Sequence, residues 1–216
     1  MCGIVGYIGN KDAVPILLKG LQRLEYRGYD SAGISVMGTG GIQIVKQAGK
    51  VSELSKAVDD SPISGTIGIA HTRWATHGEP NNINAHPHTD ASETFSLVHN
   101  GIIENHTSLR TYLHEKGVSF KTETDTEVLV QLIGYLYQKE EISFEQAVRS
   151  ALQEVVGAYG IAVTCKDEQE TIIVARLGSP LVLGVGDDEY FVASDASPIV
   201  EYTRRVVYLD EGEMVC

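Results

Sequence analysis

The chain has few of the features that mark secreted, membrane-spanning or disulfide-bonded proteins. Its 216 residues include three cysteines, one tryptophan and six prolines. Three widely separated cysteines do not make a disulfide framework, and no closely spaced pair resembles a zinc motif. The longest apolar runs are about six residues, whereas roughly 20 are needed to span a bilayer. The sequence therefore predicts neither a membrane protein nor a disulfide-stabilised one.

Basic residues are scarce as well. There are 17 Lys and Arg against 29 Asp and Glu, which gives a formal net charge of -12. Such a surface repels phosphate backbones, so we expect no nucleic-acid partner. The first residues contain neither a basic segment nor a long apolar one, which argues against a secretory signal. With 43% apolar and 21% charged residues, the composition is that of a globular domain, and we expect a cytoplasmic location.

Strand patterns occupy both ends of the chain, and helical patterns occupy its middle. This order favours an α+β or layered sandwich over a regular doubly wound sheet. A helix is expected after Asp12, and a turn at Asn100-Gly101 is expected to end the strand before it. The predicted strands are 3–8, 32–36, 42–48, 66–70, 95–99, 160–165, 171–175, 181–185, 190–193 and 206–209, and the later helices are 105–116, 125–138 and 143–155.

Cys2 is the first candidate for chemistry. Removal of Met1 is expected before a small residue, and it would leave a thiol and a free α-amine on Cys2. The amine titrates near pH 8, so it can serve as a base for the thiol on the same residue. Gly3 leaves room for a substrate to approach. The alternative is that Cys2 is only a small buried side chain.

A polar segment that follows a predicted strand offers groups for binding a carboxylate. Arg73 can make two parallel hydrogen bonds to a carboxylate, and Thr76 and His77 add donors. Trp74 would either form the wall of a pocket or pack in the core.

Two further segments complete the candidate site. Asn100 offers a side-chain amide, and Gly101 offers a backbone N–H without a side chain, a pair suited to an oxyanion hole. An ordinary turn is the alternative. Asp125 lies at a predicted helix start, where it would either favour the helix dipole or bind an ammonium group.

The histidines suggest a metal site only weakly. His86 and His88 are close to each other, but no pair of histidines four residues apart accompanies a helical glutamate. The glycines form neither a phosphate-binding loop nor a dinucleotide fingerprint. We therefore expect no metal and no cofactor.

Taken together, these segments resemble the class II glutamine amidotransferases, which are N-terminal nucleophile hydrolases. The resemblance covers nearly the whole chain and implies a four-layer αββα sandwich with two antiparallel sheets. It is carried by Met1–Gly6, Arg27–Gly33, Arg73–Gly78, Asn84–His88 and Glu123–Glu127.

The resemblance also implies how glutamine is cleaved. Cys2 would attack the side-chain amide, Asn100 and Gly101 would stabilise the oxyanion, and water would hydrolyse the resulting thioester. Arg27 would order the chain near Cys2, or serve a structural role.

Substrate recognition is implied for five further positions. Arg73, Thr76 and His77 match positions that hold the glutamine α-carboxylate, and Asp125 matches the one that binds the α-ammonium group. Trp74 matches the residue that guards the ammonia passage.

The same segments narrow the resemblance to the branch that transfers the ammonia to fructose 6-phosphate. We therefore expect residues 1–216 to be one glutaminase domain of a longer chain, with fructose 6-phosphate bound only by missing C-terminal isomerase domains. The full-length protein is expected to be a homo-oligomer. Two alternatives are a non-catalytic glutamine-binding module and an amidotransferase with a phosphoribosyl or aspartyl acceptor.

Overall fold

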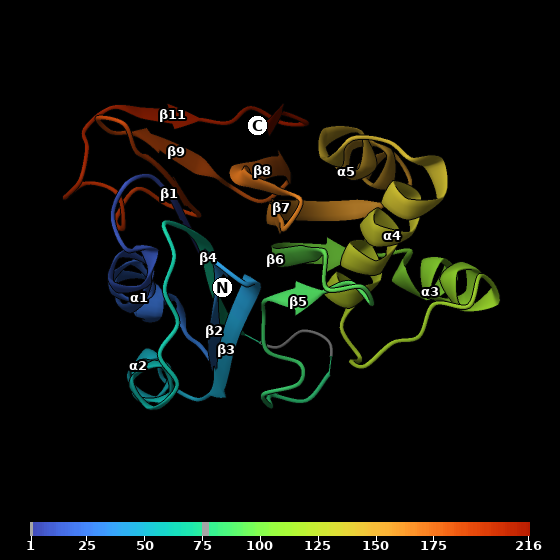
Figure 1. Cartoon of the computed structure of the whole chain (residues 1–216), viewed down its shortest axis with the longest axis horizontal. Helices are drawn as coiled ribbons and strands as arrows, with labels where there is room; N and C mark the ends of the chain where they lie inside the picture. Colours follow the sequence, from blue (N-terminus) through green and yellow to red (C-terminus); the bar gives the residue numbers. More distant parts are fainter. Residues whose placement is uncertain (1, 75–77) are drawn as a thin grey trace.

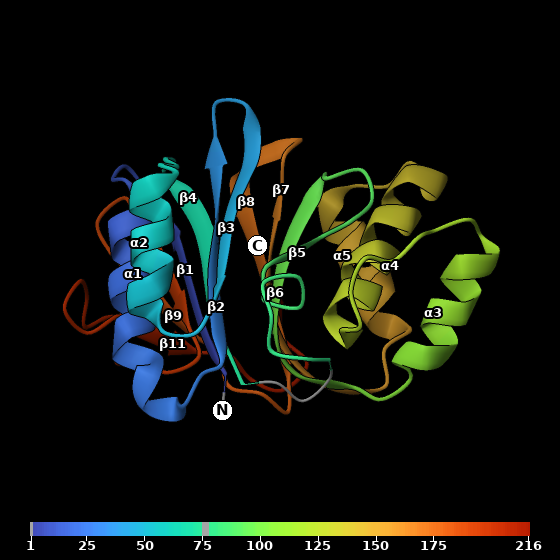
Figure 2. The ribbon, with the colours of Figure 1, turned by 90° about the horizontal axis from the view of Figure 1, so that it is seen from below.

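Two antiparallel β-sheets pack face to face, and helices cover the outer face of each (Figure 2). A computed structural model describes residues 2–74 and 78–216 of the chain. The four layers follow one another as helices, sheet, sheet and helices, which confirms the α+β sandwich expected from the sequence. No helix in the described part of the chain is long and apolar enough to cross a membrane.

The first sheet has seven strands, with the start of the chain at its centre. β1 (Gly3–Ile8) pairs with β4 (Ile67–Arg73) on one side and with β10 (Tyr190–Ala193) on the other. Cys2 therefore directly precedes a strand that is held from both sides. The complete order is β11 (Val206–Tyr208), β9 (Val182–Val185), β10, β1, β4, β2 (Ser31–Gly38) and β3 (Gly41–Ala48).

The second sheet has five strands, and the two longest antiparallel pairings in it join β6 to β7 and β7 to β8. It places β6 and β7 in its interior, with the short strands β12 and β5 at its edges. The order is β12 (Met214–Val215), β8 (Glu168–Leu177), β7 (Gly157–Cys165), β6 (Phe95–Ile103) and β5 (His88–Thr89).

The helices divide between the two outer faces (Figure 1). On one side lie α1 (Ala13–Leu24) and α2 (Val51–Asp60), and a 3-10 turn (Glu25–Arg27) follows α1. The Asp12 side chain accepts a hydrogen bond from Val14 N at 3.1 Å, as expected of a helix cap. On the other side lie α3 (His106–Glu115), α4 (Asp125–Glu140) and α5 (Phe144–Gln153).

Side chains alternate between the two faces of each strand, and this alternation produces three apolar layers. On β1, Ile4 points between the sheets, whereas Val5 and Tyr7 pack in the cluster under α1. On β6, Val98 points between the sheets, whereas Leu97 packs under the helices of the other side. A strand period of two therefore supplies both faces of each sheet with apolar side chains.

The predicted turn at Asn100-Gly101 is wrong, because β6 runs straight through both residues. Gly101 pairs with Tyr159 in the ladder with β7. Its φ is +130°, and a Cβ there would lie 2.0 Å from the carbonyl oxygen of Ala158. The glycine is needed for a close approach of two strands, a role that a sequence pattern cannot distinguish from a turn. Helix α2 was also not predicted, although Val51, Leu54 and Val58 have helical spacing and are buried.

The layer between the sheets ends in polar side chains. On β4, His71 and Arg73 continue the face that Ile67 and Ile69 begin, and all four side chains are buried. On β6, Asn100 continues the face of Val98 in the same way. The same end of the intersheet space therefore carries a cation, an imidazole and an amide.

Four histidines are buried at or near this end. The rings of His71 and His86 stack with their centroids 4.2 Å apart, and His88 meets His86 edge to face at 4.8 Å. Burial lowers the pKa of all four, His99 included, and brings the pKa of His71 to about 3. All four rings are neutral near pH 7, since burial disfavours the charged form.

We predict that the free energy of unfolding falls as the pH is lowered from 7.5 to 5.0. The unfolded chain binds protons at these histidines near pH 6.5 and the folded chain does not, so stability is lost as the pH falls through 6.5. A histidine whose folded pKa is far below 5 contributes about 2 kcal/mol of this loss. Urea unfolding at several pH values measures it.

Two variants refine the measurement. His86→Phe removes one buried titrating ring and should reduce the pH slope by about one proton. His114→Gln, which removes an exposed histidine, is the control variant. Equal stability at pH 5.0 and 7.5 in the unaltered protein would contradict the prediction.

Candidate active site

The Cys2 thiol lies against the backbone of Trp74, the residue that follows β4. The Trp74 N–H donates to Cys2 Sγ at 3.2 Å, and the thiol donates to Trp74 O at 3.6 Å. Burial raises the pKa of the Cys2 thiol, while the Trp74 N–H and the charge of Arg73 oppose the rise. A thiol in this setting needs a base to ionise near neutral pH.

Arg27 fixes the backbone around Cys2. Its guanidinium donates to Cys2 O at 3.4 Å and to Ser194 Oγ at 3.2 Å, and it pairs with Asp195 at 2.7 Å. Ser194 Oγ also accepts a hydrogen bond from Ile4 N at 3.1 Å. Arg27 thus connects the end of β10 with the start of β1.

Trp74 is an exposed residue, so the alternative that it packs in the core is wrong. Its side chain is 55% exposed. The indole lies against Gly28, where an added Cβ would come within 2.9 Å of Trp74 Cε3 and where φ is +87°. A glycine at this position lets the aromatic ring cover the turn that carries Arg27.

Arg73 ends β4 on the inner face and is only 4% exposed. Its guanidinium donates to the carbonyl oxygens of Gly78 and Glu79, each at 3.3 Å. A buried guanidinium near the thiol is a suitable partner for a carboxylate. Thr76 and His77, which were assigned to the same carboxylate, lie outside the described residues.

Asn100 reaches the same place from the opposite sheet. Its Nδ2 donates to Cys2 O at 3.3 Å, and its Oδ1 lies 2.9 Å from His71 Nε2. Gly101 follows at the point where β6 approaches Ala158. An amide N–H from β6 therefore faces the cysteine that precedes β1.

Asp125 is the first residue of α4 and is 5% exposed. Its Oδ2 accepts a hydrogen bond from Ile103 N at 2.9 Å, so the carboxylate is tied to the end of the strand that carries Asn100. Thr124 caps the helix by accepting from Glu127 N at 3.1 Å. Because Thr124 supplies the cap, the Asp125 carboxylate is not needed for that purpose.

Hydrogen bonds thus join Cys2 to Arg27, Trp74 and Asn100. Sequence reasoning missed three residues that hold this group together: His71, Ser194 and Asp195. Only the contacts of the fold reveal Ser194 and Asp195, whereas the position of His71 two residues before Arg73 was a usable sequence signal.

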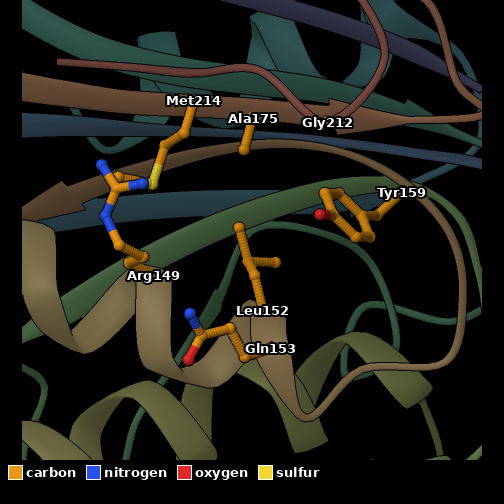
Figure 3. A pocket seen from close by; sticks show the side chains of 7 residues that line it. All are labelled: Arg149, Leu152, Gln153, Tyr159, Ala175, Gly212 and Met214. Carbon is orange, nitrogen blue, oxygen red and sulfur yellow. The ribbon is translucent and has the colours of Figure 1, made fainter.

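A separate pocket of about 180 Å³ lies between α5 and β12 (Figure 3). Arg149, Tyr159 and Met214 line it, and none of the predicted site residues does. Within residues 2–74 and 78–216, no group of three or more His, Cys, Asp or Glu side chains is placed to hold a metal ion. Cys2, by contrast, lies at the end of the intersheet space, beside Trp74 and Asn100.

The chain is similar to known proteins in sequence and in fold. A family model described as a glutamine amidotransferase domain matches residues 55–214. The glutamine–fructose-6-phosphate aminotransferase (isomerizing) of Bacteroides thetaiotaomicron is 59% identical over 99% of this chain, and that of Thermus thermophilus is 50% identical over all of it. This chain spans 35% of the length of each.

Solved structures agree with the relatives. The glutamine phosphoribosylpyrophosphate amidotransferase of B. subtilis superposes with a TM-score of 0.84 at 30% identity, over 99% of this chain and 46% of that one. A glutamine aminotransferase class-II domain protein from Silicibacter pomeroyi, at 17% identity and a TM-score of 0.63, shares the fold. On the extent of these matches, the chain belongs to the glutamine amidotransferase domain family.

Proposed function

We propose that this chain hydrolyses glutamine to glutamate and ammonia with Cys2 as the nucleophile. The observation that carries the proposal is the meeting of two groups from opposite sheets: the Cys2 residue before β1 and the Asn100 amide on β6, 3.3 Å from Cys2 O. A nucleophile and an amide donor at one point are what acyl transfer requires.

The reaction balances with the groups at hand. After removal of Met1, the Cys2 α-amine takes the thiol proton, and the thiolate attacks the side-chain carbonyl carbon of glutamine. Asn100 Nδ2 and Gly101 N–H donate to the oxyanion. The α-ammonium returns the proton to the leaving nitrogen, so ammonia departs and a thioester remains. Water, deprotonated by the same amine, then releases glutamate and restores the thiol.

Glutamine recognition rests on two opposite charges. Arg73 is proposed to bind the α-carboxylate together with Thr76 and His77, and Asp125 to bind the α-ammonium group. The burial of Arg73 and Asp125 supports this proposal, because charges in a poorly solvated site discriminate strongly against ligands that lack the partner charge. Trp74, exposed beside Cys2, is proposed to guard the path of the ammonia.

We further propose fructose 6-phosphate as the acceptor, with glucosamine 6-phosphate as the product. The names of relatives at 50–59% identity support this acceptor over a phosphoribosyl one, whose named example is 30% identical. Acceptor chemistry would belong to domains beyond the 35% of those relatives that this chain spans. The cytoplasmic location and the homo-oligomeric state stay predictions.

We predict that Cys2→Ala abolishes release of ammonia from glutamine, by about a thousandfold or more, because no other group forms the thioester. A coupled ammonia assay measures the rate. Cys216→Ala, which removes an exposed thiol, should retain the full rate.

A diazoketone analogue of glutamine should add once, at Cys2, and protein that keeps Met1 should be neither labelled nor active. Activity that survives Cys2→Ala contradicts the proposal, and glutamine binding without ammonia release indicates a binding module instead.

We also predict that Asp125→Asn raises the KM for glutamine by about 10- to 100-fold with a smaller change in kcat, because one ionic contact to the substrate is lost. Asparagine keeps an oxygen for the Ile103 N–H, so the helix start should be preserved. Glu104→Gln, which neutralises an exposed carboxylate, is the control. An unchanged KM in Asp125→Asn would remove Asp125 from the binding site.

A further inference from the structure

The hydrogen bond between His71 and Asn100 crosses from one sheet to the other. His71 lies on β4, between Ile4 of β1 and Gly33 of β2, and its Nε2 is 2.9 Å from Asn100 Oδ1 on β6. Both side chains are buried. This contact therefore determines how the Asn100 amide is presented to Cys2.

The two ends of an amide have nearly the same shape and opposite hydrogen-bonding character. With Oδ1 on His71, Nδ2 points to Cys2 and can donate to an oxyanion. If the amide rotated by half a turn, Oδ1 would face the Cys2 carbonyl at about 3.3 Å and would repel an oxyanion. The orientation of Asn100 is thus a requirement of the proposed reaction.

His71 selects the orientation through its tautomer. A neutral imidazole donates from one ring nitrogen and accepts at the other. Burial lowers the pKa of the His71 ring to about 3 and so holds the ring neutral. The hydrogen bond to Asn100 and the nearby His99 backbone oppose this lowering of the pKa only in part. Nδ1 has no hydrogen-bond partner within the described segments, so a proton there would leave a buried donor unsatisfied. The proton therefore belongs on Nε2, facing Oδ1.

The ring itself cannot turn away. It stacks on His86 with the planes 18° apart. The backbone of His86 is in turn pressed against β2, because a Cβ on Gly33 would lie 2.1 Å from His86 O. His86 thus supports the face of the His71 ring, while Asn100 contacts its edge at Nε2.

We infer that His71 is a positioning residue, whose Nε2–H holds the Asn100 amide with its N–H groups toward the reacting carbonyl of glutamine. This inference rests on the proposed function, because it assigns His71 a task in the reaction of Cys2. It predicts an effect on turnover rather than on glutamine binding.

Two amide substitutions separate positioning from packing. Glutamine places its N–H2 near the position of Nε2, whereas asparagine is too short to reach it. His71→Gln should keep kcat within about tenfold of the unaltered protein, and His71→Asn should lose about 100-fold in kcat with KM changed less than about threefold, the cost of one misplaced oxyanion donor. Equal losses in both variants, or a loss confined to KM, would overturn the inference.

A double substitution tests whether His71 acts through Asn100. Asn100→Ala alone should lower kcat by about 100-fold, and adding His71→Asn should lower it by no more than about threefold again. If His71→Asn lowers kcat by the same factor with and without Asn100→Ala, His71 acts independently of Asn100, and the inference is overturned. Cys2→Ala is measured in parallel. If Cys2→Ala stays active, the proposed function fails. If Cys2→Ala is inactive and the losses from His71→Asn and Asn100→Ala add up, only the role of His71 is overturned.

The tautomer gives a readout that does not depend on activity. Nitrogen-15 NMR of the chain labelled at histidine, with His71→Gln used to assign the signal, should show His71 protonated at Nε2 at pH 7. Protonation at Nδ1 would overturn the inference, since Nε2 would then accept from the amide and turn Oδ1 toward Cys2.

Discussion

The packing of two sheets against each other is the constraint on which the site depends. Apolar side chains such as Ile69 and Val98 hold the sheets together through most of their contact. At one end the same inward-facing positions carry Arg73 and Asn100 instead. Because sheets pack about 10 Å apart, side chains of ordinary length from each can meet in the middle. The placement of these two polar side chains thus depends on an apolar interface that other residues form.

Much of the fold could be predicted from the sequence, because alternation and helix caps are local signals. The Asp12 cap and the extent of β1 needed only neighbouring residues. The Asn100-Gly101 pair was misread because the need for a glycine there comes from Ala158, on another strand. A constraint imposed by residues distant in the chain leaves no local trace.

The residues of the site also fall into those that the sequence marks and those that it does not. Cys2, Arg73 and Asn100 are residue types with an obvious chemistry, and a resemblance between whole segments brought them together. His71 and Asp195 act on other protein groups, so nothing in their own chemistry marks them. His71, His86, His88 and His99 are buried, and burial lowers the pKa of each ring. Burial is a property of the folded chain alone.

The position of β1 at the middle of the seven-stranded sheet also limits how this protein can be altered. Cys2, the proposed nucleophile, precedes a strand that is paired on both edges. Under the proposed mechanism, a permanent amino-terminal affinity tag would convert the Cys2 amine into an amide and remove the base. Circular permutation would have the same effect on the proposed mechanism, because it would join the Cys2 amine to another residue. A fusion at the carboxyl end leaves the Cys2 amine free for its proposed role.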